Sequence, residues 1–270
     1  MEQEYATLRG ILDNIGSCLV AFSGGVDSTF LLKVACDRLG DRVTAITAVS
    51  PSLAREEREQ AVALAVRLGV AHRLIPTGEI DNPAYVRNDA SRCYYCKKDL
   101  FEMMARIASM SGGRTVIYGA IMDDLGEDRP GMKAAREAGV RAPLIEAGLG
   151  KAVIRDLSRR LGLPTWDKPA MPCLASRLPR GTAVTVERLA LVEQAEAAVR
   201  ALGYKTVRVR YMGDDARVEL DPEGLRRVDD PVIRTLLVEA VRGAGFRQVV
   251  VDPRGYRPGG AADAAGAGGH

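Results

Sequence analysis

The sequence predicts an α/β protein, a parallel sheet with helices on both faces, followed by a small α+β domain at the C-terminal end. In the first half of the chain, short apolar segments alternate with segments of helical periodicity, which is typical of parallel sheets. From Trp166 the pattern changes to a polar, proline-containing stretch and then to strictly alternating segments. We therefore expect a first domain at 1–165 and a second at 166–257.

Five helices and four strands are expected in the first domain. The opening helix is predicted because Leu8, Ile11, Leu12 and Ile15 recur at the spacing of one helix face. The strands are short apolar runs such as "CLVAF" and "RVTAITAV", the second of them rich in β-branched residues. The expected helices span 8–15, 27–39, 53–68, a segment after Cys96 and 151–161, and the expected strands span 18–22, 42–49, 72–76 and 115–120.

The second domain is expected to start with a loop, "DKPAMPCLASRLPRG". Farther along, "KTVRVRYMG" and "ARVEL" alternate between apolar and polar residues, as half-buried strands do. The expected helices span 184–202 and 231–242, and the expected strands span 205–213, 216–220 and 248–253. Residues 258–270 are low in complexity and are expected to be disordered, because they have too little apolar surface to offset their ordering entropy.

The composition is that of an ordinary globular protein of 270 residues, with a net charge of +3. This charge is too small to indicate a nucleic-acid partner by itself. No apolar run approaches the roughly 18–20 residues that span a bilayer, and the acidic start "MEQEYATLRG" is unlike a signal peptide. We therefore expect no membrane association and a cytoplasmic location.

Five cysteines are present, and a reducing compartment makes disulfides an unexpected use for them. Cys18 and Cys36 belong to apolar segments and are expected to be small buried hydrophobic residues. Cys93 and Cys96 form the CxxC pair of "SRCYYCKKDL", and Cys173 follows in "MPCLASRLPRG". Taken by themselves, these three thiols are compatible with an iron–sulfur cluster, a zinc site, a dithiol or persulfide relay, or inert side chains. A structural zinc site normally needs four protein ligands, and the chain has only two histidines.

The stretch "AFSGGVDST" joins an apolar strand directly to a helix. Gly24 and Gly25 permit unusual backbone dihedrals and a close approach to a ligand. Ser23, Ser28 and successive backbone N–H groups can then converge on an anion. A glycine turn capped by Asp27 is the structural alternative. The stretch is not a Walker A loop, because the lysine of that motif is missing.

This loop resembles the SGGxDS motif of the PP-loop ATP pyrophosphatases. In that superfamily the loop holds the pyrophosphate of ATP while an acceptor oxygen attacks the α-phosphorus, so that an adenylated intermediate forms. The resemblance implies that Ser23, Gly24, Gly25 and Ser28 surround the phosphates, and that Asp27 positions the loop or its Mg²⁺.

An acidic stretch follows the strand expected at 115–120. Doubly wound sheets present their ligands at such strand ends. Asp123, Asp124, Glu127 and Asp128 are therefore candidates for holding a cation at a triphosphate, and Asp124 is assigned to ATP binding. The alternative is a run of charges on a solvated surface.

Together with "CLASR" and "VRVR", these motifs resemble the LarE family, the ATP-dependent sulfur transferases that build the nickel-pincer nucleotide cofactor. The resemblance extends over nearly the whole chain, to about Tyr256. It implies that a carboxylate of pyridinium-3,5-biscarboxylic acid mononucleotide is adenylated and converted to a thiocarboxylate. It also implies a homo-oligomer.

The resemblance gives the three cysteines specific roles. Cys173 matches the sulfur-bearing position of the family, and members with that cysteine alone surrender its sulfur. Cys93 and Cys96 make this chain similar to a second type, in which three cysteines hold a [4Fe-4S] cluster. Three thiolate ligands leave one iron with an open position, where an extra sulfide can bind and be replenished from sulfide or a sulfur donor.

Charged residues of the second domain are candidates for substrate binding. Strand alternation places Arg208 and Arg210 on one face, where two guanidinium groups suit a phosphate. The resemblance matches these arginines to the substrate phosphate, and Glu196 and Glu219 to acidic residues near a second cation. Arg177 is expected to neutralise the adenylate or the substrate carboxylate. The alternative for Arg208, Arg210 and the two glutamates is exposed charges that pair across a two-strand surface, and the alternative for Arg177 is a plain charge on the loop surface.

Two other functions remain open. The first is a PP-loop tRNA thiolase, which uses the same kind of cysteine set. Such an enzyme would be expected to have a broader basic surface and aromatic residues that stack on bases, and only 5% of the residues in this chain are aromatic. A non-catalytic carrier of a cluster or sulfide, regulated by a nucleotide, is the second alternative. Pyrophosphate release that depends on an acceptor would distinguish an enzyme from such a carrier.

Overall fold

The computed structural model describes residues 1–126 and 129–257 and divides the chain into two compact units. Unit 1 comprises Met1–Asn82 and Ser91–Met171, and unit 2 comprises Pro83–Ala90 and the chain from Pro172 onward. The domain boundary at 165/166 stays a prediction, and the sequence did not indicate that Pro83–Ala90 would pack into unit 2. The predicted disorder of 258–270 lies outside the described residues, as do Glu127 and Asp128.

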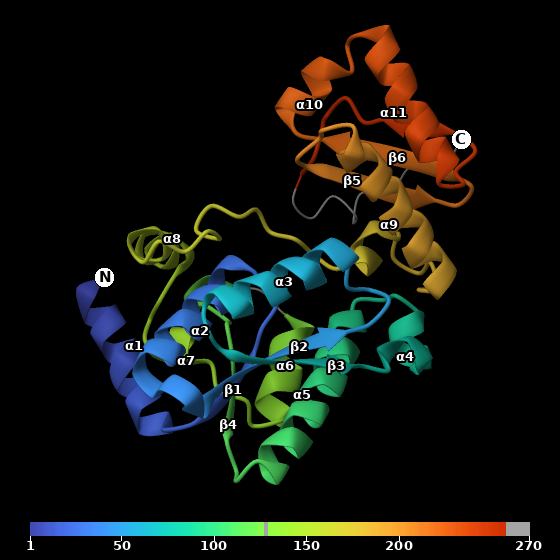
Figure 1. Ribbon diagram of the computed structural model, residues 1–270. Helices are drawn as coiled ribbons and strands as arrows, with labels where there is room; N and C mark the ends of the chain where they lie inside the picture. The colour runs from blue at the N-terminus through green and yellow to red at the C-terminus, as the bar shows by residue number, and fades with distance from the viewer. Residues whose placement is uncertain (127–128, 258–270) are drawn as a thin grey trace. The chain divides into compact units, whose positions relative to one another are not determined.

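Unit 1 contains a parallel sheet of four strands in the order β3-β2-β1-β4 (Figure 1). The strands are β1 (Cys18–Ala21), β2 (Val43–Val49), β3 (Ala71–Pro76) and β4 (Thr115–Tyr118). All three pairings are parallel, and β1 lies between β2 and β4. The α/β class and the four predicted strands are therefore confirmed, with differences of one or two residues at their ends.

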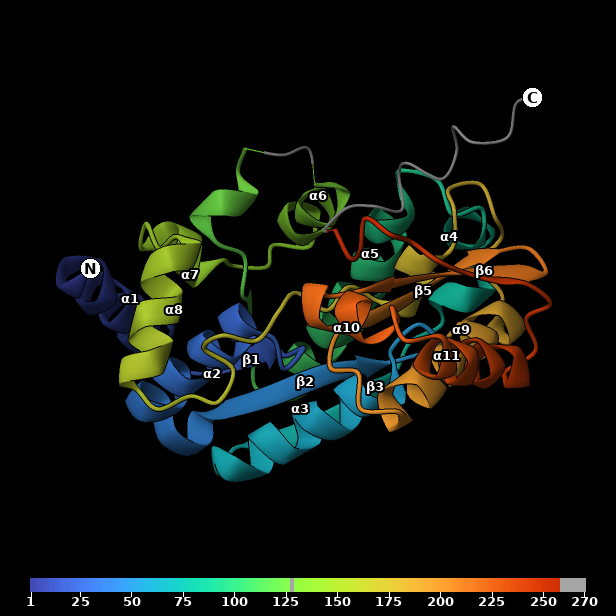
Figure 2. The same cartoon turned by 90° about the horizontal axis from the view of Figure 1, so that it is seen from above.

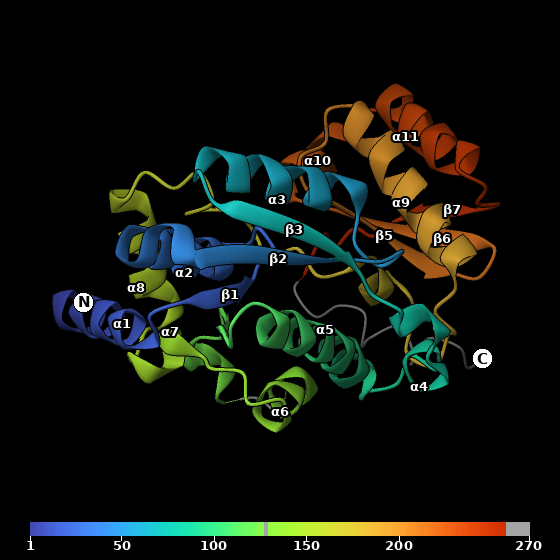
Figure 3. The ribbon, with the colours of Figure 1, turned by 60° about the horizontal axis from the view of Figure 1, so that its bottom comes forward.

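Helices cover both faces of this sheet because successive strand residues point to opposite sides. Cys18 and Val20 belong to one apolar core, and Leu19 between them belongs to the other. The first core is formed with α1 (Glu2–Ile15), α2 (Val26–Leu39), α3 (Arg55–Arg67), α7 (Pro143–Glu146) and α8 (Lys151–Arg160). Figure 2 shows α7 and α8 next to α1 and α2. The other core is formed with α5 (Arg92–Met110) and α6 (Pro130–Glu137), which pack against each other (Figure 3).

Some short elements of unit 1 were not expected from the sequence. Helix α6 begins with Pro130 at a first-turn position, where proline costs no hydrogen bond. Three 3₁₀ turns also occur: η1 (Gly40–Arg42), η2 (Glu79–Asp81) and η3 (Met122–Asp124). These segments are too short for hydrophobic periodicity to reveal them.

Cys18 behaves as predicted, since it is fully buried, and burial raises the pKa of its thiol to about 12. Cys36 is partly buried against the same core, and burial raises the pKa of its thiol to about 11. Both thiols are therefore protonated at neutral pH and unreactive.

Unit 2 contains a small mixed sheet in the order β5-β6-β7. Its strands are β5 (Val207–Met212), β6 (Asp215–Leu220) and β7 (Val249–Val251), with β5 and β6 antiparallel and β6 and β7 parallel. The helices are α4 (Pro83–Val86), η4 (Leu174–Arg177), α9 (Val186–Ala201), α10 (Pro222–Arg227) and α11 (Pro231–Gly243). Helices α9 and α11 lie side by side, with α9 against β5 (Figure 3). The small α+β domain is thus confirmed.

Side-chain caps define where the helices of unit 2 begin. Thr185 accepts a hydrogen bond from the Arg188 N–H at the start of α9, and Asp221 and Asp230 do the same for α10 and α11. Among the described residues, no helix is both long enough and apolar enough to cross a membrane.

Candidate functional site

A cavity of about 390 Å³ opens in unit 1 at the carboxyl ends of β1, β2 and β4. The chain leaves β1 for β2 on one side, and β4 lies on the other side, so this is the topological switch point of the sheet. Its polar lining comes from Ser23, Gly25, Asp27, Ser28, Thr47, Lys97, Asp124 and Arg129, and its apolar lining includes Ile46, Leu53, Leu100, Tyr118 and Met132. A cavity with apolar walls and a few convergent polar groups is typical of a small-molecule site.

The glycines of "AFSGGVDST" allow the loop to lie flat against neighbouring elements. Gly24 has φ +70°, and a Cβ atom there would lie 3.3 Å from the Cα of Ala61 on α3. Gly119, at the end of β4, is similarly confined, since its Cβ would lie 3.0 Å from the backbone nitrogen of Ser28. Both positions therefore require glycine for close backbone packing.

Hydroxyl and N–H groups converge at the start of α2, as the sequence predicted. The hydroxyl oxygens of Ser23 and Ser28 lie 3.1 Å apart, and the Gly25 N–H points to the Ser23 hydroxyl at 3.4 Å. Gly25 is the N-cap of α2 and has no side chain to cap the helix, so the N–H groups of the first turn are available to a ligand. This arrangement can bind an anion such as a phosphate.

Asp27 is held by a lysine that no sequence motif indicated. The ammonium of Lys151, at the start of α8, lies 2.8 and 3.0 Å from the two carboxylate oxygens of Asp27. Asp27 does not cap α2, so the structural alternative of an aspartate-capped turn is wrong. Lys151 is the first residue of α8 and lies before the apolar residues of that helix. Its position at the start of a predicted helix is the only sequence signal that could have pointed to it.

The aspartates after β4 have different surroundings. Asp124 lines the cavity, accepts a hydrogen bond from the Ile121 N–H at 3.0 Å and pairs with Arg129 at 2.5 Å. Asp123 instead accepts a hydrogen bond from the backbone N–H of Lys151 at 2.8 Å, at the start of α8. Asp124 is thus the one of these two that faces the cavity.

The CxxC pair forms the first turn of α5, and both thiols belong to unit 1. Cys93 is exposed and Cys96 is partly exposed. Cys93 stands four residues before Lys97, which lines the cavity, so both lie on the same side of the helix. Gly131 of α6 packs on this turn, since its Cβ would lie 3.7 Å from the Cys93 carbonyl oxygen and 3.1 Å from Cγ of Lys97. The CxxC turn therefore borders the cavity of unit 1.

Cys173 belongs to unit 2 and precedes the 3₁₀ turn η4. Its side chain is exposed. Arg177 donates hydrogen bonds to the carbonyl oxygens of Pro172 and of Cys173, the latter at 3.0 Å. The backbone of Cys173 is thus fixed while its thiol stays accessible.

The three thiols fit an iron–sulfur cluster in type, since such clusters bind cysteine thiolates. Within residues 1–126 and 129–257, no group of three or more His, Cys, Asp or Glu side chains comes together as a metal site. The cluster therefore stays a prediction, based on the donor set.

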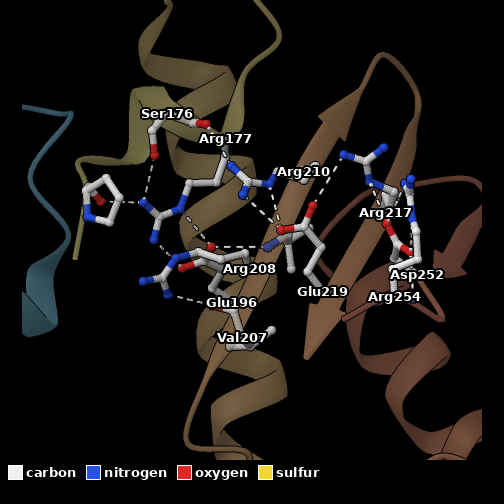
Figure 4. A network of polar contacts seen from close by, with 12 residues as sticks. Ser176, Arg177, Glu196, Val207, Arg208, Arg210, Arg217, Glu219, Asp252 and Arg254 are labelled. Carbon is white, nitrogen blue, oxygen red and sulfur yellow. Dashed lines mark hydrogen bonds and ion pairs between the residues drawn. The ribbon is translucent and has the colours of Figure 1, made fainter. Parts of the chain in front are cut away.

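Arg177 is buried and forms an ion pair in unit 2 with Glu196 of α9 (Figure 4). Its guanidinium donates to both carboxylate oxygens of Glu196, at 2.9 and 3.1 Å. Glu196 is 0% exposed and also accepts from Arg200 at 2.8 Å and from the Val209 N–H at 3.1 Å. A cation at Glu196 stays a prediction, and these donors already occupy its oxygens.

Arg208 and Arg210 lie on the face of β5 that alternation predicted, opposite Glu219 and Arg217 of β6. They are buried, with 2% and 5% exposure. Arg210 donates to Glu219 at 2.8 and 3.0 Å and to the Ser176 carbonyl oxygen at 2.9 Å. The alternative of an exposed charged surface is therefore wrong. The sequence did not reveal the burial because the partner carboxylates come from other elements.

This network, which Figure 4 shows, contains more arginines than carboxylates. The carboxylates that Figure 4 labels are Glu196, Glu219 and Asp252, and the arginines are Arg177, Arg208, Arg210, Arg217 and Arg254. Arg200, which the figure does not label, also pairs with Glu196. Arg254 is more than half exposed, and the other arginines are buried or mostly buried. Excess positive charge in such a network attracts anions.

The neighbouring charges shift the pKa values of Glu196 and Arg208. Burial alone would raise the pKa of Glu196, but Arg177, Arg208 and Arg200 outweigh it and hold that pKa below its ordinary value. For Arg208, burial and then the charge of Arg177 lower the pKa of the guanidinium, and Glu196 opposes this shift.

Comparison with known proteins places this arrangement in a family. No family model matches the chain. The chain is 46% identical over 259 residues to an uncharacterized protein of Synechocystis sp., covering 96% of this chain and 97% of that protein. It is 28% identical over 219 residues to a glutamine-hydrolyzing GMP synthase of Aeropyrum pernix, covering 72% of this chain and 41% of that protein.

A more informative relative is the pyridinium-3,5-bisthiocarboxylic acid mononucleotide synthase of Lactiplantibacillus plantarum. The two chains are 40% identical over 255 residues, which cover 94% of this chain and 92% of the synthase. Identity of this degree over nearly the full length of both proteins, together with the loop at the switch point of the sheet, shows that the chain belongs to the LarE family of pyridinium-3,5-bisthiocarboxylic acid mononucleotide synthases.

Proposed function

We propose that this protein is an ATP-dependent sulfurtransferase that converts a carboxylate of pyridinium-3,5-biscarboxylic acid mononucleotide into a thiocarboxylate. The name of the L. plantarum synthase supports a thiocarboxylated pyridinium mononucleotide as the product. The observation that carries the ATP dependence is the convergence of Ser23, Gly25 and Ser28 at the start of α2, inside a cavity at the switch point.

The loop would bind the phosphates of ATP. Ser23, Gly24, Gly25 and Ser28 supply hydroxyl and N–H donors to the pyrophosphate. Asp124 faces the cavity with its carboxylate and is proposed to bind Mg²⁺, which prefers carboxylate oxygens. Asp27 lies in the same lining, where its pair with Lys151 orients it.

The reaction would proceed in two displacements. A substrate carboxylate oxygen attacks the α-phosphorus of ATP, a new P–O bond forms, and pyrophosphate leaves with the electron pair of the broken bond. Sulfide sulfur then attacks the carbonyl carbon of the acyl-adenylate, a C–S bond forms, and AMP leaves with the electron pair of the C–O bond. The N–H donors of the loop would stabilise the charge that develops on the phosphates, and Mg²⁺, if held by Asp124, would supply further positive charge there.

The sulfur would be delivered through Cys93, Cys96 and Cys173. We propose that these three thiolates hold a [4Fe-4S] cluster, which when bound supplies an iron with an open position for an extra sulfide. The position of the CxxC turn at the border of the nucleotide cavity supports this use of Cys93 and Cys96. The alternative is that Cys173 alone surrenders its sulfur.

The arginine network of unit 2 would bind the phosphate of the substrate nucleotide. Arg208 and Arg210 are proposed as its ligands, because they belong to a network with more guanidinium groups than carboxylates. Arg177 is proposed to act on the reacting group through Cys173, whose backbone it holds.

The test is pyrophosphate release by purified protein given ATP, Mg²⁺ and one acceptor at a time. The proposal predicts release only with the pyridinium nucleotide and its loss in Ser28→Ala, with Ser111→Ala as the control, since that exposed hydroxyl bonds only within α5. Release that depends on tRNA would instead support a tRNA thiolase. Nucleotide binding without release for any acceptor would support a carrier.

A further inference from the structure

We infer that Lys168 is a positioning residue, one that orients the nucleotide loop by holding the carbonyl group of Gly24. The inference extends the proposed function in one respect only, the binding of ATP phosphates by the loop. Lys168 stands in the polar, proline-containing stretch that was expected to be a plain loop, and it belongs to unit 1.

The side chain of Lys168 has three oxygen partners. Its ammonium nitrogen lies 2.8 Å from Oε1 of Gln60, 3.2 Å from Oε2 of Glu57 and 3.3 Å from the carbonyl oxygen of Gly24. The side chain is only 15% exposed, and Glu57 is buried beside it. All these contacts lie within unit 1. An ammonium group with three fixed oxygen partners has little freedom to move.

Fixing the Gly24 carbonyl also fixes the N–H group that binds the ligand. In a trans peptide the C=O and the next N–H point in opposite directions. Since the Gly24 carbonyl turns toward Lys168, the Gly25 N–H turns toward Ser23, whose hydroxyl lies 3.4 Å from it. Gly25 lines the cavity. Lys168 therefore determines on which side of the peptide the anion-binding N–H lies.

The contacts within the loop leave the Gly24 carbonyl group to be held from outside. Gly24 and Gly25 have no side chains to restrain their peptide groups, and glycine adopts a wider range of backbone dihedrals than other residues. The hydroxyl contacts within the loop all involve Ser23 or Ser28, and none reaches the Gly24 carbonyl oxygen. Packing on Ala61 restrains Gly24 on one side, and Lys168 supplies the directional contact that packing lacks.

Lys168 also balances the charge of the buried Glu57, so the stability of the protein depends on it. Its Oε1 is buried and makes no hydrogen bond, so the charge of the carboxylate is balanced by Lys168 through Oε2. Removing the lysine alone would leave a buried carboxylate without its counter-charge, which destabilises a protein strongly. The test therefore pairs Lys168→Met with Glu57→Gln, and compares it with Glu57→Gln alone.

The first measurement is amide hydrogen exchange in the nucleotide-free protein. The inference predicts faster exchange of the Ser23–Ser28 loop in Lys168→Met/Glu57→Gln than in Glu57→Gln, and unchanged exchange in the sheet. The matched control is Lys33→Met, which removes the same charge from an exposed pair with Asp37 on α2. A lysine that only contacted a bound phosphate would leave exchange in the empty protein unchanged, and that result would overturn the inference.

The second measurement is binding of ATP, pyrophosphate and adenosine. We expect affinity for ATP and pyrophosphate to fall about tenfold in the double variant, and affinity for adenosine to stay unchanged, because only the phosphate-binding N–H loses its orientation. Lys168→Arg should retain most of the ATP affinity. An equal loss for adenosine would indicate collapse of the cavity and contradict the inference. If the unaltered protein bound neither ATP nor pyrophosphate, the proposed function would fail, while the exchange result would still decide the role of Lys168.

Discussion

Arg177 is a charged residue whose guanidinium is buried and paired within unit 2. Its guanidinium holds the backbone of Pro172 and Cys173 on one side and the carboxylate of Glu196 on the other. The sequence indicated a residue near the reaction, but the structure places its charge in a buried pair. The backbone on both sides of the Pro172–Cys173 peptide is therefore tied to this buried pair.

Replacing Arg177 should therefore damage stability. Arg177→Met leaves Glu196, with 0% exposure, as a buried carboxylate short of its main partner, which costs about 3–5 kcal/mol of unfolding free energy. Urea unfolding checks this value. The control is Arg242→Met, because its pair with Glu239 is about half exposed and should contribute less than about 1 kcal/mol. Equal losses in the two variants would contradict the buried pair.

The titration of Glu196 gives a pH dependence with a definite sign. Its pKa lies below the ordinary 4.5, because the arginines outweigh the effect of burial. A carboxyl group whose pKa is lowered by folding contributes its full stabilisation above the unfolded pKa, and this contribution is lost as the pH falls through the folded pKa. The difference in unfolding free energy between the unaltered protein and Glu196→Gln should thus shrink as the pH falls below 4.5. A difference that stays constant below that pH would show that Glu196 does not titrate in this way.

At the scale of elements, the parallel strands and most helices were predictable because their hydrophobic periods are long. Burial of Arg208 and Arg210 was not, since alternation tells which face a residue is on but not what covers that face. Arg210 pairs with Glu219 of β6, and Glu196 of α9 acts electrostatically on Arg208. Lys151 and Lys168 were missed for a related reason, because their partners lie more than 100 positions away in the chain.

The close approach of β4 to α2 is a further property of elements. A Cβ atom at Gly119 would meet the backbone nitrogen and Cα of Ser28 at 3.0 and 3.1 Å. Gly119→Ala should therefore displace the start of α2 and weaken ATP binding about tenfold, a cost typical of overpacking. Calorimetric titration with ATP measures it.

The control for this variant is Gly10→Ala on α1, where a Cβ atom meets nothing within 4 Å. This substitution should leave ATP binding unchanged and stabilise the protein by about 0.5–1 kcal/mol, since alanine is the better helix former. Normal ATP affinity in Gly119→Ala would show that the contact with Ser28 is not needed for the loop.

At the scale of the whole molecule, the three cysteines are divided between the units. Cys93 and Cys96 belong to unit 1, and Cys173 belongs to unit 2. Anaerobically purified protein should contain about four iron and four acid-labile sulfide per chain, as a [4Fe-4S] cluster requires. Replacing any one of the three cysteines by alanine should lower both, whereas Cys36→Ala should not, because that thiol is protonated and partly buried. If each of the three single variants kept the full iron content, Cys93, Cys96 and Cys173 would not be the ligands of the cluster.

Similarity over 94% of the chain shows the family, and the central step of the proposed reaction is the transfer of sulfur to the pyridinium mononucleotide. The most direct test is mass spectrometry of the pyridinium mononucleotide after incubation with the protein, ATP, Mg²⁺ and sulfide. We expect a product in which sulfur has replaced one carboxylate oxygen, formed together with equal amounts of AMP and pyrophosphate. AMP and pyrophosphate without any sulfur in the pyridinium nucleotide, or no nucleotide cleavage at all, would contradict this expectation.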